Sequence, residues 1–128
     1  MPKHRLFHGT NGDNILQIID TQQMRPDASG QIFFSQFDWA PVLQHGADTR
    51  RKAAFAICVD INIQPPASLQ RKQTPGVLNT LVVRTNSPLM VEVIELIVRE
   101  PGASQVSPKT SVIYYATIVN IRISYVRS

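Results

Sequence analysis

The sequence predicts a single α+β domain, spanning residues 1–128, with two helices near its N-terminus. The chain has 128 residues, the usual length of one domain, and its 43% hydrophobic content suffices for a core. Helical spacing of apolar residues occurs only in the first third of the chain, and strand patterns fill the rest. That order favours α+β over a doubly wound parallel sheet, in which strands and helices alternate.

The chain opens with a strand followed by a helix. Residues 4–8 are expected to form a short strand with Leu6 and Phe7 at its apolar centre. Asp13 can cap a helix that begins at Asn14. Four aliphatic side chains then share one helical face: Ile15, Leu16, Ile18 and Ile19.

A second strand and helix are expected after a loop at residues 24–30, which contains proline and glycine. Gln31–Ser35 is short and aromatic, as is typical of a strand. Asp38 can cap a helix that continues to Gly46, with Pro41 tolerated in its first turn.

The remaining two-thirds of the chain are dominated by strand patterns. Strands are expected at residues 53–61, 77–84 and 89–99, and the polar segment 64–76 is expected to be a connector. Apolar residues alternate along the final segment, 113–125, which predicts one long bent strand or a hairpin.

Composition limits the possible partners. The net charge of +4 and the pI of about 9.6 favour anionic ligands, either nucleic acid or small phosphorylated molecules. The basic clusters 50–52 and 71–72 are short, so solvated charges and phosphate contacts both remain open. Cys58 is the single cysteine, which excludes an intrachain disulfide and a thiolate metal site. Its position in the apolar run 53–59 predicts a buried, structural thiol. No apolar run approaches the length of a signal peptide or membrane span, so we expect a soluble protein or a domain cut from a larger one.

Three motifs carry possible chemistry, and the first is His8-Gly9-Thr10 at the end of the first strand. Because glycine has no Cβ, a ligand can approach the Gly9 backbone closely and be held by its N–H and C=O. The imidazole and the hydroxyl on either side can reach further along the ligand. A purely structural role for this tripeptide, taken alone, remains open.

The second motif is the aromatic strand that ends at Ser35, followed by Phe37 and Trp39. These residues can supply a stacking platform and a hydroxyl, although aromatic clusters also commonly form core. Phe33 and Phe34 are adjacent on a strand, so at most one of them can face a given site.

The third motif is the pair of carboxylates in the apolar strand 89–99. An unpaired buried charge is costly, so Glu92, near the start of the strand, is a catalytic candidate. Glu92 and Glu95 are three positions apart and are expected to point to opposite faces. Both could also be ordinary solvent-facing residues.

The order of these motifs, over about residues 4–99, resembles the ADP-ribosyltransferase superfamily. More narrowly, it is similar to the diphtheria-toxin and poly(ADP-ribose) polymerase branch, whose signature is His, then Tyr, then Glu. The resemblance implies a split β-sandwich that holds NAD, as a substrate, in a cleft between two small sheets.

The resemblance also implies a role for each matching residue. His8 would contact the adenosine-side ribose, and the Gly9 backbone would bind the nicotinamide carboxamide with Thr10 alongside. Ser35 would hydrogen-bond the carboxamide or shape its pocket. Glu92 would be the catalytic carboxylate.

One position departs from the family pattern, because the tyrosine that stacks on nicotinamide is absent from the strand. Phe33 or Phe34 stands at its first possible position, and Phe37 or Trp39 could stack instead. Which aromatic binds nicotinamide therefore stays open.

The activity implied by the resemblance is cleavage of the nicotinamide–ribose bond and transfer of ADP-ribose to a protein or nucleic acid. Such a domain can be the catalytic part of a bacterial toxin, which would act in the cytoplasm of the producer or target cell and have a cognate immunity protein. Met90 stands where the arginine-specific branch carries Gln or Glu, and the chain is too short for an RNA 2′-phosphotransferase. An NAD glycohydrolase and an inactive NAD-binding or ADP-ribose-binding module are the alternatives. No metal is expected.

Overall fold

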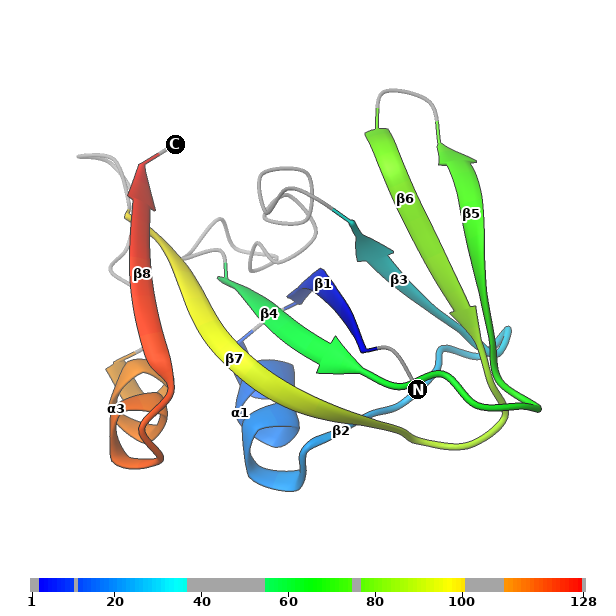
Figure 1. The fold of residues 1–128 in the computed structure, drawn as a ribbon. Coiled ribbons are helices and arrows are strands. Elements are labelled where there is room, and N and C mark those ends of the chain that lie inside the picture. The colour runs from blue at the N-terminus through cyan, green and yellow to red at the C-terminus, as the bar shows by residue number, and fades with distance from the viewer. Residues whose placement is uncertain (1–2, 11, 37–54, 75–76, 101–109, 128) are drawn as a thin grey trace.

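The computed structural model of the protein describes residues 3–10, 12–36, 55–74, 77–100 and 110–127. These residues build one eight-stranded sheet and two helices (Figure 1). The strands are β1 (His4–Thr10), β2 (Gln23–Met24), β3 (Gln31–Ser35), β4 (Phe55–Ile61), β5 (Ser68–Thr74), β6 (Val77–Arg84), β7 (Leu89–Glu100) and β8 (Arg122–Arg127). The helices are α1 (Gly12–Thr21) and α3 (Thr110–Ile118).

The sheet is almost entirely antiparallel and has the strand order β2-β7-β4-β1-β3-β6-β5. β8 lies off this path and pairs with β7 in parallel. The first strand of the chain therefore lies in the middle of the sheet, between β4 and β3 (Figure 1). A strand in this position brings its backbone and both of its side-chain faces close to residues from distant parts of the sequence.

The predicted fold class is wrong. We expected an α+β split β-sandwich with two N-terminal helices, whereas the described residues form a mostly antiparallel β-sheet with one helix near each end of the chain. The α+β expectation rested on local periodicity, which identifies strands but does not reveal which strands pair, and the split β-sandwich was implied by the resemblance alone. The helix predicted from Asp38 to Gly46 lies outside the described residues.

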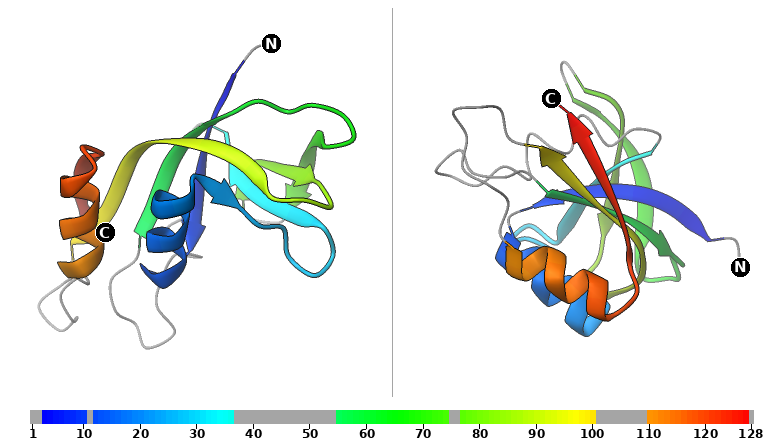
Figure 2. Two further views of the ribbon diagram at one scale, coloured as in Figure 1. Left: turned by 90° about the horizontal axis from the view of Figure 1, so that it is seen from below. Right: turned by 90° about the vertical axis from the view of Figure 1, so that its left-hand side faces the viewer.

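Both helices cover the same side of the sheet and lie beside each other (Figure 2). Ile15, Ile18 and Ile19 of α1 are buried, as their spacing predicted. The Tyr115 hydroxyl of α3 donates a hydrogen bond of 2.8 Å to the Asp20 carboxylate of α1, which raises the pKa of the tyrosine. The core therefore lies between this helical layer and one face of the sheet.

The predicted strand or hairpin at residues 113–125 is wrong in its first half, which is helix α3. Val112 and Ala116 are both fully buried and are four residues apart, so they share one helical face. The helix ends where Asn120 adopts a φ of 62°, and the Ile121 N–H bonds the Ala116 carbonyl at 2.9 Å. That arrangement is a Schellman cap, and it turns the chain into β8.

The segment expected to be a polar connector contains strand β5 instead. β5 is the edge of the sheet and pairs only with β6 among the described strands. An edge strand needs few apolar residues, and charged residues such as Arg71 protect it from pairing with other chains. Its polarity therefore concealed it from a search based on apolar alternation.

Cys58 is buried in β4, as the sequence predicted. Burial raises the pKa of its thiol to about 11. The thiol therefore stays protonated at neutral pH and is not a nucleophile.

Candidate functional site

The candidate site is built around the end of β1, which is joined to its two neighbours unequally. All residues of β1 pair with β4, including Gly9 with Ala56. Between β1 and β3 the described pairing is limited to Phe7 with Ser35. Among the described residues, Gly9 therefore has a strand partner only on its β4 side.

The direction of the β3 backbone can be established from two hydrogen bonds. Just before β3, the Gly30 carbonyl accepts a bond of 3.0 Å from the Thr85 N–H, so the even-numbered residues of β3 direct their backbone groups toward β6. The odd-numbered residues direct theirs toward β1. In agreement, the Phe33 carbonyl accepts a hydrogen bond of 2.8 Å from His8 Nδ1.

The same alternation fixes the direction of the Gly9 backbone. Phe7 pairs with Ser35, whose backbone groups face β1, so Phe7 directs its own N–H and C=O toward β3. Gly9 is two positions further along and does the same. Its φ is not positive, so the backbone does not require glycine there. The site therefore offers one backbone donor and one acceptor on a residue without a side chain.

His8 is held in a defined orientation at this position. Because a carbonyl only accepts, Nδ1 carries the proton, which leaves Nε2 of the neutral ring as an acceptor. The His8 ring lies 5.6 Å from the buried Phe34 ring, tilted by 56°. Packing and the hydrogen bond together fix the imidazole.

His8 and Thr10 line a cavity of about 160 Å³ on the α1 side of the sheet. The Thr10 hydroxyl accepts a hydrogen bond of 2.9 Å from Asn14 Nδ2. The other walls are mostly polar: Gln17, Ile18, Thr21, Gln23, Met24 and Arg25. With Arg25 as its one formal charge, the cavity suits a polar ligand that carries negative charge.

The three consecutive residues at the end of β3 have different surroundings. Phe33 is 38% exposed, whereas Phe34 is 1% exposed and belongs to the core. The expectation that these two rings point to opposite faces is confirmed. Phe33 therefore exposes part of its ring on the face opposite the core. Phe37 and Trp39, the other candidates for stacking, lie outside the described residues.

Ser35 is almost completely buried, and its neighbour across the sheet was missed by sequence reasoning. Thr80 of β6 lies directly opposite Ser35, and the two are 2% and 8% exposed. Neither hydroxyl has a hydrogen-bond partner among the described residues. A threonine in a largely apolar strand was the available signal, but its pairing with Ser35 depends on the register of β3 and β6.

The structure does not bring Glu92 to His8. Arg5, Asp60 and Glu92 are register neighbours across three strands, so their side chains share one face of the sheet. His8 is three positions from Arg5 along β1 and points to the opposite face. Glu92 also lies at the other end of β1, where Lys3 begins the described chain.

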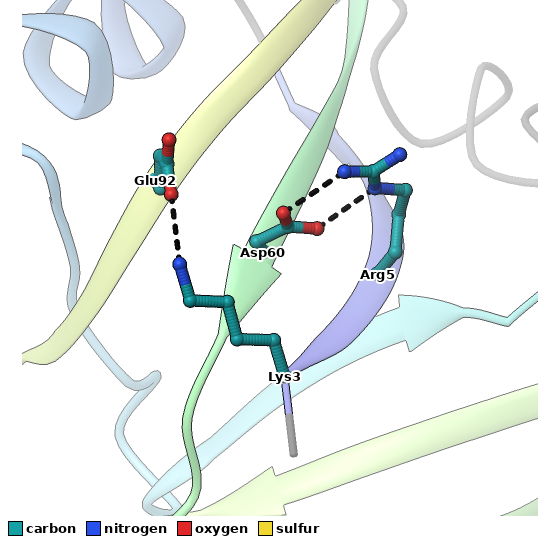
Figure 3. Close-up of polar contacts among 4 residues, drawn as sticks. All are labelled: Lys3, Arg5, Asp60 and Glu92. Carbon is teal, nitrogen blue, oxygen red and sulfur yellow. Dashed lines mark hydrogen bonds and ion pairs between the residues drawn. The ribbon is translucent and has the colours of Figure 1, made fainter. Parts of the chain in front are cut away.

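Figure 3 shows the two ion pairs formed at that end of the sheet. Arg5 binds both carboxylate oxygens of Asp60, at 2.8 and 3.0 Å. Lys3 Nζ lies 3.3 Å from Glu92 Oε2, and both of these side chains are more than half exposed. Glu92, Asp60 and Lys3 also line a separate open cavity of about 500 Å³, together with most residues of the segments 61–67 and 85–91.

The expectation that Glu92 and Glu95 point to opposite faces is wrong. Cys58 pairs with Glu95 but the next residue, Val59, pairs with Val93, so β7 has a bulge between them. Because of the extra residue in β7, Glu92 and Glu95 point to the same face of the sheet although they are three positions apart. The Glu95 carboxylate accepts a hydrogen bond of 2.9 Å from the Ser124 hydroxyl and forms an ion pair of 3.3 Å with Arg122.

The Arg5–Asp60 pair predicts a specific dependence of stability on pH. The hydrogen bonds from Arg5 hold the pKa of Asp60 below its ordinary value of 3.8. The pair's contribution is therefore complete above that value and is lost as the pH falls through the lowered pKa. In urea unfolding at pH 7 and pH 3, we expect Asp60→Asn to lose stability at pH 7 and to show a smaller pH dependence than wild type.

The matched control for that measurement is Glu92→Gln. Exposed ion pairs contribute about 0–1 kcal/mol, so this variant should unfold almost as wild type at both pH values. An equal loss of stability in the two variants would show that the bidentate Arg5–Asp60 pair stabilises the fold no more than the exposed Lys3–Glu92 pair does.

Comparison with known proteins adds no family assignment. No protein-family model matches the chain, and no curated protein shows significant similarity to it. Within the described ranges, no three His, Cys, Asp or Glu side chains are arranged to hold a metal ion. Neither α1 nor α3, the helices that the structure describes, is long and apolar enough to cross a membrane.

Proposed function

We propose that this protein binds NAD at the end of β1 and acts as an ADP-ribosyltransferase. The observation that carries the proposal is the Gly9 backbone, which faces β3 without a described strand partner two residues beyond the pair formed by Phe7 and Ser35. An N–H and a C=O on one residue complement the two ends of a carboxamide. Phe33, on the neighbouring strand, would supply the stacking surface for the nicotinamide ring.

The polar cavity lined by His8 and Thr10 lies on the α1 side of the sheet, on the other face from Phe33 and Ser35, and would bind a separate anionic group. Arg25 in the wall of this cavity can bind phosphate oxygens. Transfer would break the bond between the ribose C1′ and the nicotinamide nitrogen, with the electron pair leaving on nicotinamide. The acceptor's nucleophile would bond to C1′ and lose its proton.

A second candidate is an NAD-binding module that does not cleave its ligand. This reading is favoured by the position of Glu92, which lies on the opposite face of the sheet from His8. The transition state of this cleavage resembles that of glycoside hydrolysis, in which positive charge develops on the sugar. Electrostatic stabilisation of that charge is commonly the largest catalytic term, so a transferase needs a carboxylate that reaches the ribose and a binding module does not.

The deciding experiment measures NAD affinity and release of free nicotinamide for wild type, Glu92→Gln and Glu95→Gln. We expect wild type to release nicotinamide, and Glu92→Gln to bind NAD as tightly as wild type because Glu92 is remote from Gly9. If one of the two variants loses about 100-fold in turnover but binds NAD as tightly as wild type, the glutamate replaced in it is the catalytic carboxylate. Bound NAD without any release would support the binding module.

The acceptor is tested with labelled NAD in lysate, with and without nuclease. Label that disappears with nuclease identifies nucleic acid as the acceptor, which the net charge of +4 favours. Label that survives nuclease but not protease identifies protein. Nicotinamide release without labelling identifies a glycohydrolase.

A further inference from the structure

Polar side chains gather on one face of the sheet where β3, β6 and β5 lie side by side (Figure 1). Gln31, Arg84 and Ser68 are register partners across these strands, and Gln70 is two positions from Ser68 along β5. Their side chains therefore point to the same face, which is also the face of Phe33. We call Gln31, Ser68, Gln70 and Arg84 the polar strip. It spans about 10 Å across the sheet, since neighbouring strands are about 4.8 Å apart.

A ligand can reach the polar strip from solvent. Arg84 and Gln70 are exposed, whereas Gln31 and Ser68 are partly buried. Phe33, two positions beyond Gln31 on β3, is 38% exposed. The strip is therefore an accessible surface of the sheet and not part of the core.

Arg84 is the charged member of the strip and is held in a defined orientation. With the Gln31 amide oriented so that its oxygen faces the guanidinium, that oxygen accepts hydrogen bonds from two Arg84 nitrogens, at 2.9 and 3.3 Å. These bonds use two of the five guanidinium N–H donors, and a guanidinium matches the geometry of phosphate oxygens. Asp27, which precedes β3, binds the backbone N–H groups of Ser29 and Gln31, at 2.9 and 3.1 Å. The strip thus presents a guanidinium beside neutral hydrogen-bonding groups.

We propose that the polar strip is the surface on which a single-stranded nucleic acid binds as the acceptor of ADP-ribose. This inference rests on the proposed function, in which the acceptor's nucleophile must reach C1′ of the ribose next to nicotinamide. Phe33 would stack on nicotinamide, and the strip begins two residues away from it on the same face. Arg84 would bind a phosphate, and the amides of Gln31 and Gln70 would hydrogen-bond the edges of bases.

The composition of the strip favours this acceptor over other polyanions. Amide side chains complement the donor and acceptor groups of bases, which single strands expose and a duplex holds in base pairs. An acidic peptide would require several cations for neutralisation, whereas the strip combines one cation with three neutral side chains. The net charge of +4 adds a general attraction for nucleic acid.

The test measures binding of a labelled single-stranded oligonucleotide by fluorescence anisotropy, over a range of salt concentrations and without NAD. We expect Arg84→Gln to bind about tenfold more weakly than wild type, because a charge-assisted hydrogen bond to phosphate is lost. The slope of log K against log salt should also fall by about 0.7, the value for one phosphate contact in a single strand. Gln70→Glu, which places a carboxylate on the strip, should weaken binding by a similar factor through repulsion of the phosphates.

The matched control is Arg122→Gln, which makes the same change in net charge as Arg84→Gln. Arg122 lies on β8, which pairs with β7 at the other end of the sheet, and its side chain is 78% exposed. This variant should bind the oligonucleotide within about twofold of wild type, because a distant exposed charge is largely screened by salt. The melting temperatures of all three variants should lie close to that of wild type, since the replaced side chains are exposed.

Equal binding by Arg84→Gln and Arg122→Gln would overturn the inference, because net charge would then explain the affinity. Tighter binding of a duplex, or of an acidic peptide, than of the single strand would overturn it as well. Release of nicotinamide from NAD by wild type is measured separately. Release without oligonucleotide binding would refute the inference and leave the proposed function standing. Oligonucleotide binding through the strip without any binding of NAD would refute the proposed function and leave the strip as a nucleic-acid-binding surface.

Discussion

Phe34→Ala is expected to lower the free energy of unfolding by about 3–5 kcal/mol, a large part of the stability of a domain of this size. The Phe34 ring is 1% exposed and lies in the core cluster between the sheet and helix α1. Removing it leaves a cavity that neighbouring strands can fill only in part. Urea unfolding followed by far-UV circular dichroism measures the effect. The tilted contact with His8 is lost at the same time, so NAD affinity should also fall.

The matched control is the neighbouring aromatic residue. Phe33 is 38% exposed on the opposite face, so Phe33→Ala should cost less than about 1.5 kcal/mol of stability. On our proposal it should nevertheless weaken NAD binding, through loss of stacking worth about 0.5–1.5 kcal/mol. Equal destabilisation by the two substitutions would contradict the assignment of these side chains to opposite faces.

The second large effect is expected for Gly9→Val, which should weaken NAD binding by about 100-fold or more, equivalent to about 2.7 kcal/mol. Gly9 lies in a regular strand and its φ is not positive, so the backbone can accept a β-branched residue. Stability should therefore change little or rise slightly. The added side chain would keep the ligand away from the Gly9 N–H and C=O. Calorimetry with NAD and thermal melting of the free protein measure the two quantities.

Gly30→Val gives the opposite pattern and serves as the control. Gly30 has a φ of +78°, and a Cβ there would lie 3.3 Å from the Thr85 carbonyl oxygen. A β-branched residue in that conformation is strained, so stability should fall by about 1–3 kcal/mol while the folded protein still binds NAD. Unchanged NAD affinity in Gly9→Val would remove the backbone of β1 from the binding site.

The comparison between sequence and structure is instructive for Glu92 and Thr80. Glu92 was singled out because a carboxylate in an apolar strand is unusual, and it proved to be exposed and paired with Lys3. Thr80 attracted no attention because threonine is common in strands. Its burial and its position opposite Ser35 exist only in the paired sheet. Residue type alone therefore did not show where these two side chains lie in the sheet.

Local patterns in the sequence determined the elements whose side chains have a clear period. Local patterns correctly predicted helix α1, strands β3 and β6, and the burial of Cys58, because each depends on a short segment of neighbouring residues. The same patterns did not predict the helix at residues 110–118 or the edge strand β5, because tertiary contacts decide both.

Only the tertiary structure decided how these elements form a site. Strand order, register and the bulge in β7 set which side chains share a face, and a shift of one residue reverses every face. The sequence identified His8, Gly9 and Ser35 as candidates, but the pairing of β1 with β3 puts the His8 and Ser35 side chains on opposite faces of the sheet and leaves the Gly9 backbone facing β3. The same register separates Glu92 from them, because pairing between distant strands is specified by the whole sheet and not by any one segment.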